Sequence, residues 1–295
     1  MATARQTRTL ISRTQLNRPR GKAIYWTIFT LVIITFTLAF LGPLYWMITS
    51  GLKPVHEVIQ SPPTLFPQHP QVKPYQDAWT QLNLGRLLLN TVIYAGGALF
   101  LQLTICVAAA YSLSKLRPIL GNAILGGMLA TLMIPAAILF VPQYLTVLDV
   151  PIIHVNLINT PWVIWLPSVA NAFNIFLLKR FFDSIPEDLM AAAAIDGASS
   201  FRTLRSVVLP MSRPILGVVS IFTVMAVWKD FLWPLITLTD PSRLTLNVGV
   251  QQEVGALSPN IVMAGLAIAS LPTIGFFLIF QKNIMSGLTS GGIKG

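Results

Sequence analysis

The sequence predicts an all-α, polytopic membrane protein with six transmembrane helices. Of its 295 residues, 54% are hydrophobic and only 10% are charged, whereas a soluble domain carries roughly 25% charged residues. Five stretches lack Asp, Glu, Lys and Arg, and each is longer than the roughly 20 apolar residues that cross a bilayer core. A sixth, from Ile215 to Thr239, is apolar apart from Lys229 and Asp230. Lipid, rather than water, is therefore expected to surround most of the chain.

The apolar stretches place the helices in order along the chain. The predicted spans are residues 24–50, 88–114, 120–145, 160–180, 214–238 and 261–283. A basic segment precedes the first span, as in a signal peptide, but the apolar run exceeds the roughly 7 to 15 residues of such a segment. It also shows no clear small-residue cleavage site, so we interpret it as a permanent span. Residues 24–283 then form one transmembrane domain between two tails, 1–23 and 284–295.

The basic residues follow membrane topology rather than a nucleic-acid-binding motif. An even number of spans places both termini on one side, and fifteen of the twenty Lys and Arg residues fall on that side. The other side holds Lys53, Lys73, Arg86 and Arg243, and Lys229 lies within a span. The positive-inside rule therefore predicts that both termini are cytoplasmic. The basic N-terminal tail is expected to contact anionic membrane lipid, and no nucleic-acid partner is expected.

Few residues suggest chemistry. The single cysteine, Cys106, falls inside the second span, supports no disulfide and is interpreted as a small apolar core residue. His56, His69 and His154 lack metal-ligand spacing, and no phosphate-binding loop of the form GxxxxGK(S/T) occurs. We therefore expect no catalytic residues, no metal site and no directly bound cofactor.

The segment between the fourth and fifth spans, residues 184–214, predicts two short cytoplasmic helices. Ser184 is positioned to cap the first, an alanine run propagates it, and Gly197 ends it in a left-handed conformation. Ser199 or the next serine caps the second helix, and Pro210 stops it. The alanine-rich face favours close docking against another surface. An amphipathic linker lying on the membrane fits the same pattern.

This segment resembles a known family. The pattern AAxxDGA and a later apolar-LP ending are carried by Ala192, Ala193, Asp196, Gly197, Ala198, Leu209 and Pro210. They are similar to the cytoplasmic signature loop of binding-protein-dependent ABC importer permeases. The wider pattern IPxxLxxAAxxDGA resembles the oligosaccharide branch, particularly the MalG-type second permease of maltose transporters. Further matches are SGLKP at 50–54, WKDFLWPL at 228–235 and the terminal GLTSGGIKG.

The resemblance implies a type I ABC importer permease fold in a bacterial cytoplasmic membrane. The implied partners are a second homologous permease, a dimer of cytosolic ABC ATPase subunits that binds ATP and Mg, and an extracytoplasmic sugar-binding protein. In such importers the signature loop forms coupling helices that sit in a cleft of the ATPase. The residues expected to carry these contacts are Asp188, Ala191, Ala192, Ala193, Asp196, Gly197, Ala198, Ser199, Ser200, Phe201, Leu209 and Pro210.

One position departs from the family pattern. The family usually has Glu where Ala191 stands, and that carboxylate pairs with a basic group on the ATPase. Asp188 lies about one turn earlier on the same helix face. We therefore hypothesise that Asp188 replaces the missing carboxylate.

The fifth span contains candidate pathway residues. Ionisable groups within a span cost free energy to bury, so they usually face a polar cavity or a partner. Lys229 and Asp230 are therefore candidates for the transport pathway or for a structural pair with another span. Trp228 offers a surface that suits either a sugar ring or the membrane interface. A self-contained secondary transporter is the alternative function, but Asp230 is its one candidate intramembrane carboxylate. A membrane-embedded enzyme would need a cluster of reactive groups, which is not visible.

Two external segments complete the chain. Residues 51–86 contain six prolines and are expected to be ordered but mostly irregular. In similar permeases the loop corresponding to residues 239–260 projects toward the binding protein, so Gln252, Glu253 and Gly255 are expected to dock it. Oligosaccharides are the first expected substrates, with monosaccharides or glycerol-phosphate compounds as alternatives.

Overall fold

The computed structural model describes residues 19–290, and every named element in this range is a helix. The all-α prediction is therefore confirmed. Of the predicted tails, 1–23 and 284–295, residues 1–18 and 291–295 lie outside this range. The parts inside it belong to the first and last helices.

Three helices are each long and apolar enough to cross a membrane. They are α2 (Pro19–Ser50), α5 (Leu84–Tyr111), which continues into the π-helix η1 (Ser112–Leu116), and α16 (Pro259–Ser290). They include the predicted first, second and sixth spans. Hydropathy and length alone are therefore sufficient to find these three.

The other predicted spans are interrupted helices rather than continuous ones. The elements involved are α6 (Gly121–Thr131), α7 (Ala136–Leu148), α8 (Trp162–Ser168), α9 (Ala172–Asp183), α13 (Arg213–Lys229) and α14 (Leu232–Thr237). The bend is 103° between α6 and α7 and 48° between α8 and α9, and α13 meets the preceding helical segment at 83°. Counting each bent pair as one span gives six candidate spans among the described residues. Continuous helices over 120–145, 160–180 and 214–238 were thus wrong predictions.

Prolines account for two of the breaks. A proline cannot donate to the carbonyl four residues earlier, and its ring clashes with that carbonyl in a regular helix. Pro135 lies four residues after Thr131, where α6 ends. Pro234 lies four residues after Asp230, where the backbone is extended, with φ −64° and ψ 133°. Between α8 and α9, Asn171 is also extended and caps α9.

Helix α5 is central to the bundle, because it packs against α8, α9 and α13. Its side chains contribute to two buried apolar clusters. One contains Leu84 and Leu87, and the other contains Cys106 and Val107. Cys106 is fully buried, so its interpretation as an apolar core residue is confirmed.

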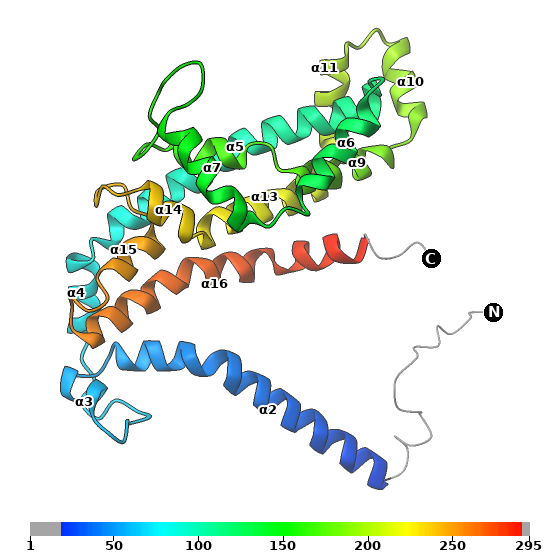
Figure 1. Cartoon of the computed structure of the whole chain (residues 1–295). Coiled ribbons are helices and arrows are strands. Elements are labelled where there is room, and N and C mark those ends of the chain that lie inside the picture. The colour runs from blue at the N-terminus through cyan, green and yellow to red at the C-terminus, as the bar shows by residue number, and fades with distance from the viewer. Residues whose placement is uncertain (1–18, 291–295) are drawn as a thin grey trace.

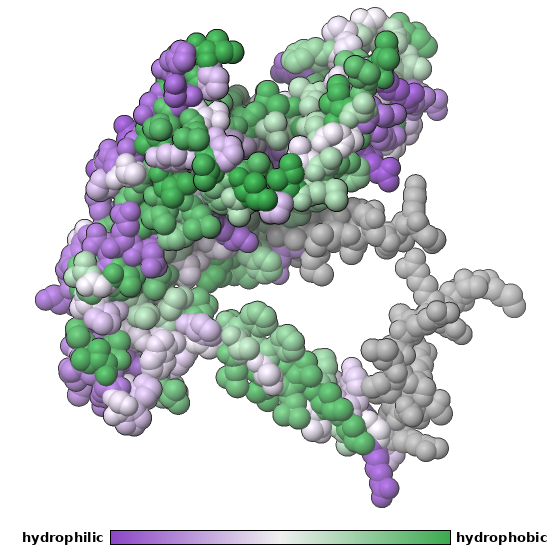
Figure 2. All heavy atoms as spheres, in the orientation of Figure 1, coloured by the Kyte–Doolittle hydropathy of each residue, from purple (hydrophilic) through white to green (hydrophobic). Residues whose placement is uncertain are grey.

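Helix α2 is the least buried of the long helices. It meets α16 near one end and diverges from the bundle toward the other (Figure 1). In Figure 2 hydrophobic side chains cover most of its length, and only Thr49 and Ser50 at its end are buried. An apolar helix with almost no protein neighbours requires a surrounding that is itself apolar, as a membrane is.

The segment 51–86 contains more helix than predicted, because α3 (Val55–Ile59) and α4 (Lys73–Gln81) lie within it. A buried polar network orders the rest. Lys53, only 1% exposed, donates from Nζ to Thr64 O at 2.5 Å and lies 4.6 Å from the centre of the Trp46 ring. Glu57 Oε1 accepts hydrogen bonds from Thr64 Oγ1 at 2.7 Å and from a backbone N–H at 3.0 Å.

Candidate functional site

The predicted coupling segment forms a helical hairpin at one end of the bundle (Figure 1). The hairpin comprises α10 (Glu187–Ile195), α11 (Ser200–Thr203), the π-helix η2 (Leu204–Val208) and α12 (Leu209–Met211). Gly197 adopts φ +69°, and its N–H donates to Ala194 O at 3.0 Å. The N–H of Ala198 donates to Ala193 O at 2.9 Å. These bonds form a Schellman motif, which confirms the predicted left-handed end of the first helix.

The caps of the two hairpin helices differ in how well the sequence predicted them. Ser199 caps α11, as predicted, because its Oγ accepts a hydrogen bond from Arg202 N–H at 3.3 Å. The prediction that Ser184 caps α10 was wrong. Its Oγ donates to Phe181 O at 2.6 Å, and Pro186 occupies the cap position instead.

Pro210 does not stop the second helix, contrary to the prediction. The preceding turn, η2, is π-helical, so Leu209 N–H bonds to Leu204 O, five residues earlier. Such a turn changes the hydrogen-bond register just before the proline, which has no N–H to contribute. The helical path breaks only at Ser212, which is buried.

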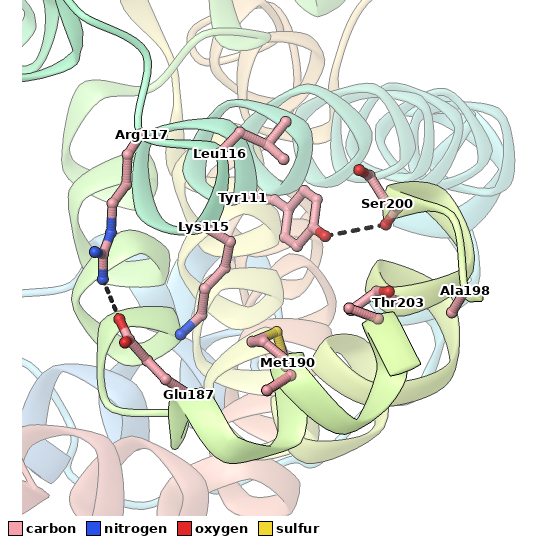
Figure 3. A pocket seen from close by; sticks show the side chains of 11 residues that line it. Tyr111, Lys115, Leu116, Arg117, Glu187, Met190, Ala198, Ser200 and Thr203 are labelled. Carbon is pink, nitrogen blue, oxygen red and sulfur yellow. Dashed lines mark hydrogen bonds and ion pairs between the residues drawn. The ribbon is translucent and has the colours of Figure 1, made fainter. Parts of the chain in front are cut away.

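Side chains from the end of α5 fix the hairpin to the bundle (Figure 3). Tyr111 OH donates to Ser200 O at 3.0 Å, and Arg117 forms an ion pair with Glu187. Lys115 Nζ donates to a backbone carbonyl just before α10 at 3.0 Å. The hairpin is therefore attached to the end of α5 and to η1 at both of its helices.

A cleft of about 420 Å³ separates the hairpin from α5 (Figure 3). Met190, Ala191 and Ala194 line it from α10, and Tyr111 and Lys115 line it from the other side. Sequence reasoning missed the role of the α5 end, since it treated Lys115 only as a topology signal. The π-turn that directs this lysine toward the hairpin has no recognisable local signature.

The hairpin presents an apolar tip to the surroundings. Ile195 is 86% exposed and Phe201 is 71% exposed, on either side of the Gly197 turn. Phe201 was a predicted coupling residue, whereas Ile195 was missed. The other predicted residues are exposed except for Ala193, which is buried, and Ala198 and Leu209, which are half-buried.

The two acidic residues at the start of α10 have different environments. Glu187 lies at the rim of the cleft and pairs with Arg117. Asp188 is exposed, does not line the cleft, and forms no ion pair among the described residues. Asp188 is therefore the carboxylate that remains free for a partner.

The three predicted pathway residues have separate environments. Trp228 is half-buried against the apolar core, and its carbonyl accepts a hydrogen bond from Asn247 Nδ2 at 2.8 Å. Lys229 is the last residue of α13 and is exposed. Asp230 follows the helix end and lines a hollow of about 270 Å³ with Gln143 and other residues. The prediction that Lys229 and Asp230 share one helix was wrong, since α13 ends between them.

The predicted docking residues lie at the end of α15 (Leu246–Gln252) and directly after it. Gln252 and Gly255 are exposed and Glu253 is half-buried, and Gly255 turns the chain with φ +96°. The loop that precedes α15 is fixed to α5, because Asn90 Nδ2 donates to two of its carbonyls, each at 3.0 Å. The exposed turn therefore belongs to a segment that is hydrogen-bonded to α5.

A bent bundle of up to six candidate spans, with an anchored hairpin at one end, is the architecture of a polytopic membrane protein. Residues 102–289 match the family described as the inner membrane component of binding-protein-dependent transport systems, and the chain belongs to this family. The permease is a multi-pass, non-catalytic membrane subunit, and a self-contained secondary transporter is not favoured.

Named relatives agree with this assignment. The chain is 30% identical to the diacetylchitobiose uptake system permease protein NgcG of Streptomyces coelicolor, over 89% of this chain and 87% of that one. It is 32% identical to the sulfoquinovosyl glycerol transport system permease protein SmoH of Agrobacterium fabrum, over 86% and 89%. A crystal structure of a bacterial ABC transporter involved in alginate import has a chain with the same fold. It matches with a TM-score of 0.80 and 22% identity, over 93% of this chain and 99% of that one.

Proposed function

We propose that this chain is one of two permease subunits of an ATP-driven importer for sugars or sugar conjugates. The relatives' names refer to diacetylchitobiose, sulfoquinovosyl glycerol and the oligosaccharides melibiose, raffinose and stachyose. Oligosaccharides are therefore the first substrates to test. A second homologous permease would complete the pathway, and an extracytoplasmic binding protein would deliver the sugar.

The anchored hairpin with its apolar tip is the observation that carries the proposal. Exposed Ile195 and Phe201 flank a rigid turn, and exposed apolar side chains of this kind suit a protein interface. A dimer of cytosolic ATPase subunits, with ATP and Mg bound to it, is the proposed partner. Both chain termini and the hairpin would then be cytoplasmic, in agreement with the distribution of basic residues.

The mechanism follows from how the hairpin is attached. Closure of the ATPase dimer on ATP binding would move α10, and the bonds from Tyr111, Lys115 and Arg117 would transfer that movement to α5. Because α5 packs against α8, α9 and α13, the membrane-spanning helices would move with it. On the opposite side, Gln252, Glu253 and Gly255 would contact the binding protein.

Assembly with the ATPase tests the proposal. The chain is produced together with its second permease and ATPase, and the amount of ATPase that copurifies is measured. Ile195→Glu is expected to lower it at least about 10-fold, because a charge is placed in a buried apolar contact. Ile119→Glu is the matched control, since Ile119 is fully exposed just after η1 and does not line the cleft. Equal ATPase recovery with both variants would contradict the proposed role of the hairpin.

A further inference from the structure

Two hollows adjoin within the membrane-spanning part. The first, of about 270 Å³, lies between α7, α8 and α13 and is lined by Gln143 and Asp230. The second, of about 260 Å³, is lined by Gln102 from α5 and Asn174 from α9. The residues that line both hollows are Ser168, Ala226 and Val227. The two hollows therefore lie side by side along α13, and together they are called the groove.

The groove follows the bent helices. From Phe222 in α13 to Asp230, just past the end of that helix, it covers eight residue steps, or about 12 Å at a helical rise of about 1.5 Å per residue. It includes Asn171, at the break between α8 and α9, and Asp230, at the break after α13. Broken helices are tolerated at membrane depth where they are buried in protein or line a polar cavity. Because Asn171 and Asp230 both line the hollows, the positions of these breaks favour a polar cavity.

Two of the three amide side chains that line the inner hollow have no hydrogen-bond partner among the described residues, whereas Asn171 caps α9. Gln102 and Asn174 are each only 3% exposed, and neither side chain forms a hydrogen bond with any part of residues 19–290 that the structure describes. Asn90, by contrast, bonds two carbonyls of one loop and acts as a link between elements. Neither amide is among the fully enclosed polar groups that lack a partner, so both are open to the hollow and available to a ligand there.

The groove has the chemistry of a carbohydrate site. Amides donate and accept hydrogen bonds, as hydroxyl groups do, and a carboxylate accepts them. The aromatic pairs Phe173–Phe222 and Phe140–Trp233, both with ring centres 6.2 Å apart, lie at the inner and outer hollows. Their faces suit the C–H faces of a sugar ring. Together the hollows are of the size of small-molecule sites, roughly 300–1,000 Å³.

We propose that this groove is a sugar subsite carried by this permease subunit itself, in which Gln102, Asn174, Gln143 and Asp230 bind successive hydroxyl groups. This inference rests on the proposed function. An importing sugar would first meet Asp230 and Gln143 and then move to the inner amides. The subunit then contributes to substrate selection as well as to coupling.

Uptake and ATPase activity, measured separately, test the subsite. The whole transporter is reconstituted with its binding protein, and uptake of maltotriose, raffinose and diacetylchitobiose is measured. Asn174→Leu and Gln102→Leu are each expected to lower uptake about 3- to 10-fold, the effect of losing one or two hydrogen bonds. ATPase stimulation by the sugar-loaded binding protein is expected to stay within about 2-fold of wild type, because the hairpin and the external turn are unchanged.

The matched control is Gln281→Leu, which makes the same change at an exposed amide that bonds only its own helix. It should leave both readouts unchanged. Normal uptake in the two groove variants would overturn the subsite. A parallel loss of uptake, ATPase stimulation and complex assembly would also overturn it, since it would show that the amides bind a neighbouring helix.

A labelling measurement keeps the inference testable if the amide variants fail to fold. Ala226 lines both hollows and is exposed, whereas the native Cys106 is fully buried. In the Ala226→Cys complex, at least one of the three sugars at millimolar concentration is expected to slow maleimide labelling at least about 2-fold. No slowing by any of them would overturn the subsite. Absence of uptake by the wild-type complex would instead contradict the proposed function.

Discussion

At the scale of single residues, the hypothesis is that Asp188 replaces a carboxylate that the resembling family carries at the position of Ala191. Glu187 is already paired with Arg117, so Asp188 is the acidic residue at the start of α10 that is left for the proposed ATPase partner. Asp188→Ala is expected to lower ATPase-coupled uptake about 2- to 5-fold, because an exposed ion pair contributes roughly 0.2–1 kcal/mol.

The conservative variant distinguishes a charge effect from a structural one. Asp188→Glu keeps the carboxylate and the helix start, and it should restore most of the uptake in the same reconstituted assay. Unchanged coupling in Asp188→Ala, at normal expression, would show that the hypothesis is wrong. The exposed Ile195 and Phe201 would then carry the contact without an ion pair.

Glu57 is expected to make segment 51–86 sensitive to acid. Burial tends to raise its pKa, but hydrogen bonds from Thr64, Gln68 and His69, together with Lys53, lower the pKa below the ordinary glutamate value. A lowered folded-state pKa gives stabilisation that is complete above the unfolded value, roughly 4.3, and is lost as the pH falls through the folded value. The wild-type chain should therefore lose thermal stability in this range.

The test is the pH dependence of the melting temperature in detergent. Glu57→Gln keeps an oxygen that accepts from Thr64 and from the Gln68 N–H but cannot titrate. Its melting temperature should change less between about pH 6 and pH 3 than that of the wild type. Parallel curves for the two proteins would show that Glu57 does not contribute.

At the scale of elements, proline spacing explains what hydropathy missed. The apolar stretches located six spans, but α6 and α13 end at Thr131 and Lys229 because Pro135 and Pro234 disrupt the turns before them. The position of such a break can be predicted from the sequence. Its bend angle cannot, because the packing of neighbouring helices sets it. The π-turn before Pro210 depends in the same way on the contacts of the hairpin with α5.

The junction of α2 and α16 depends on a glycine. A Cβ at Gly51 would lie 2.9 Å from Ala264 Cα, which is backbone and cannot move aside. Gly51→Ala is therefore expected to destabilise the chain by about 1–3 kcal/mol, seen as a lower melting temperature of the purified protein. Gly42→Ala, in the open part of α2 where a Cβ meets nothing within 4 Å, is the control. If the two variants have the same melting temperature, the close approach of the backbone at Gly51 does not contribute to stability.

At the scale of the whole molecule, the prediction is the orientation of the chain in the membrane. Phe66, 72% exposed, lies in segment 51–86, and the fully exposed Ile119 lies just after η1, outside the proposed ATPase contact. In intact cells an impermeant thiol reagent should label Phe66→Cys, and it should label Ile119→Cys only after permeabilisation. Cys106 is fully buried and gives little background. The opposite pattern would invert the topology and would contradict a cytoplasmic ATPase partner.

The sequence by itself determined the class of the protein, because the signals involved are local. Apolar length marks the spans, basic residues predict their orientation, and Gly197 and Ser199 set the turn and cap of the hairpin. Contacts between distant segments, in contrast, were decided only by the tertiary structure. Tyr111 reaches the backbone of Ser200, and the groove gathers polar residues from several separate helices. Such contacts depend on how bent helices pack, and no local pattern in the chain encodes that geometry.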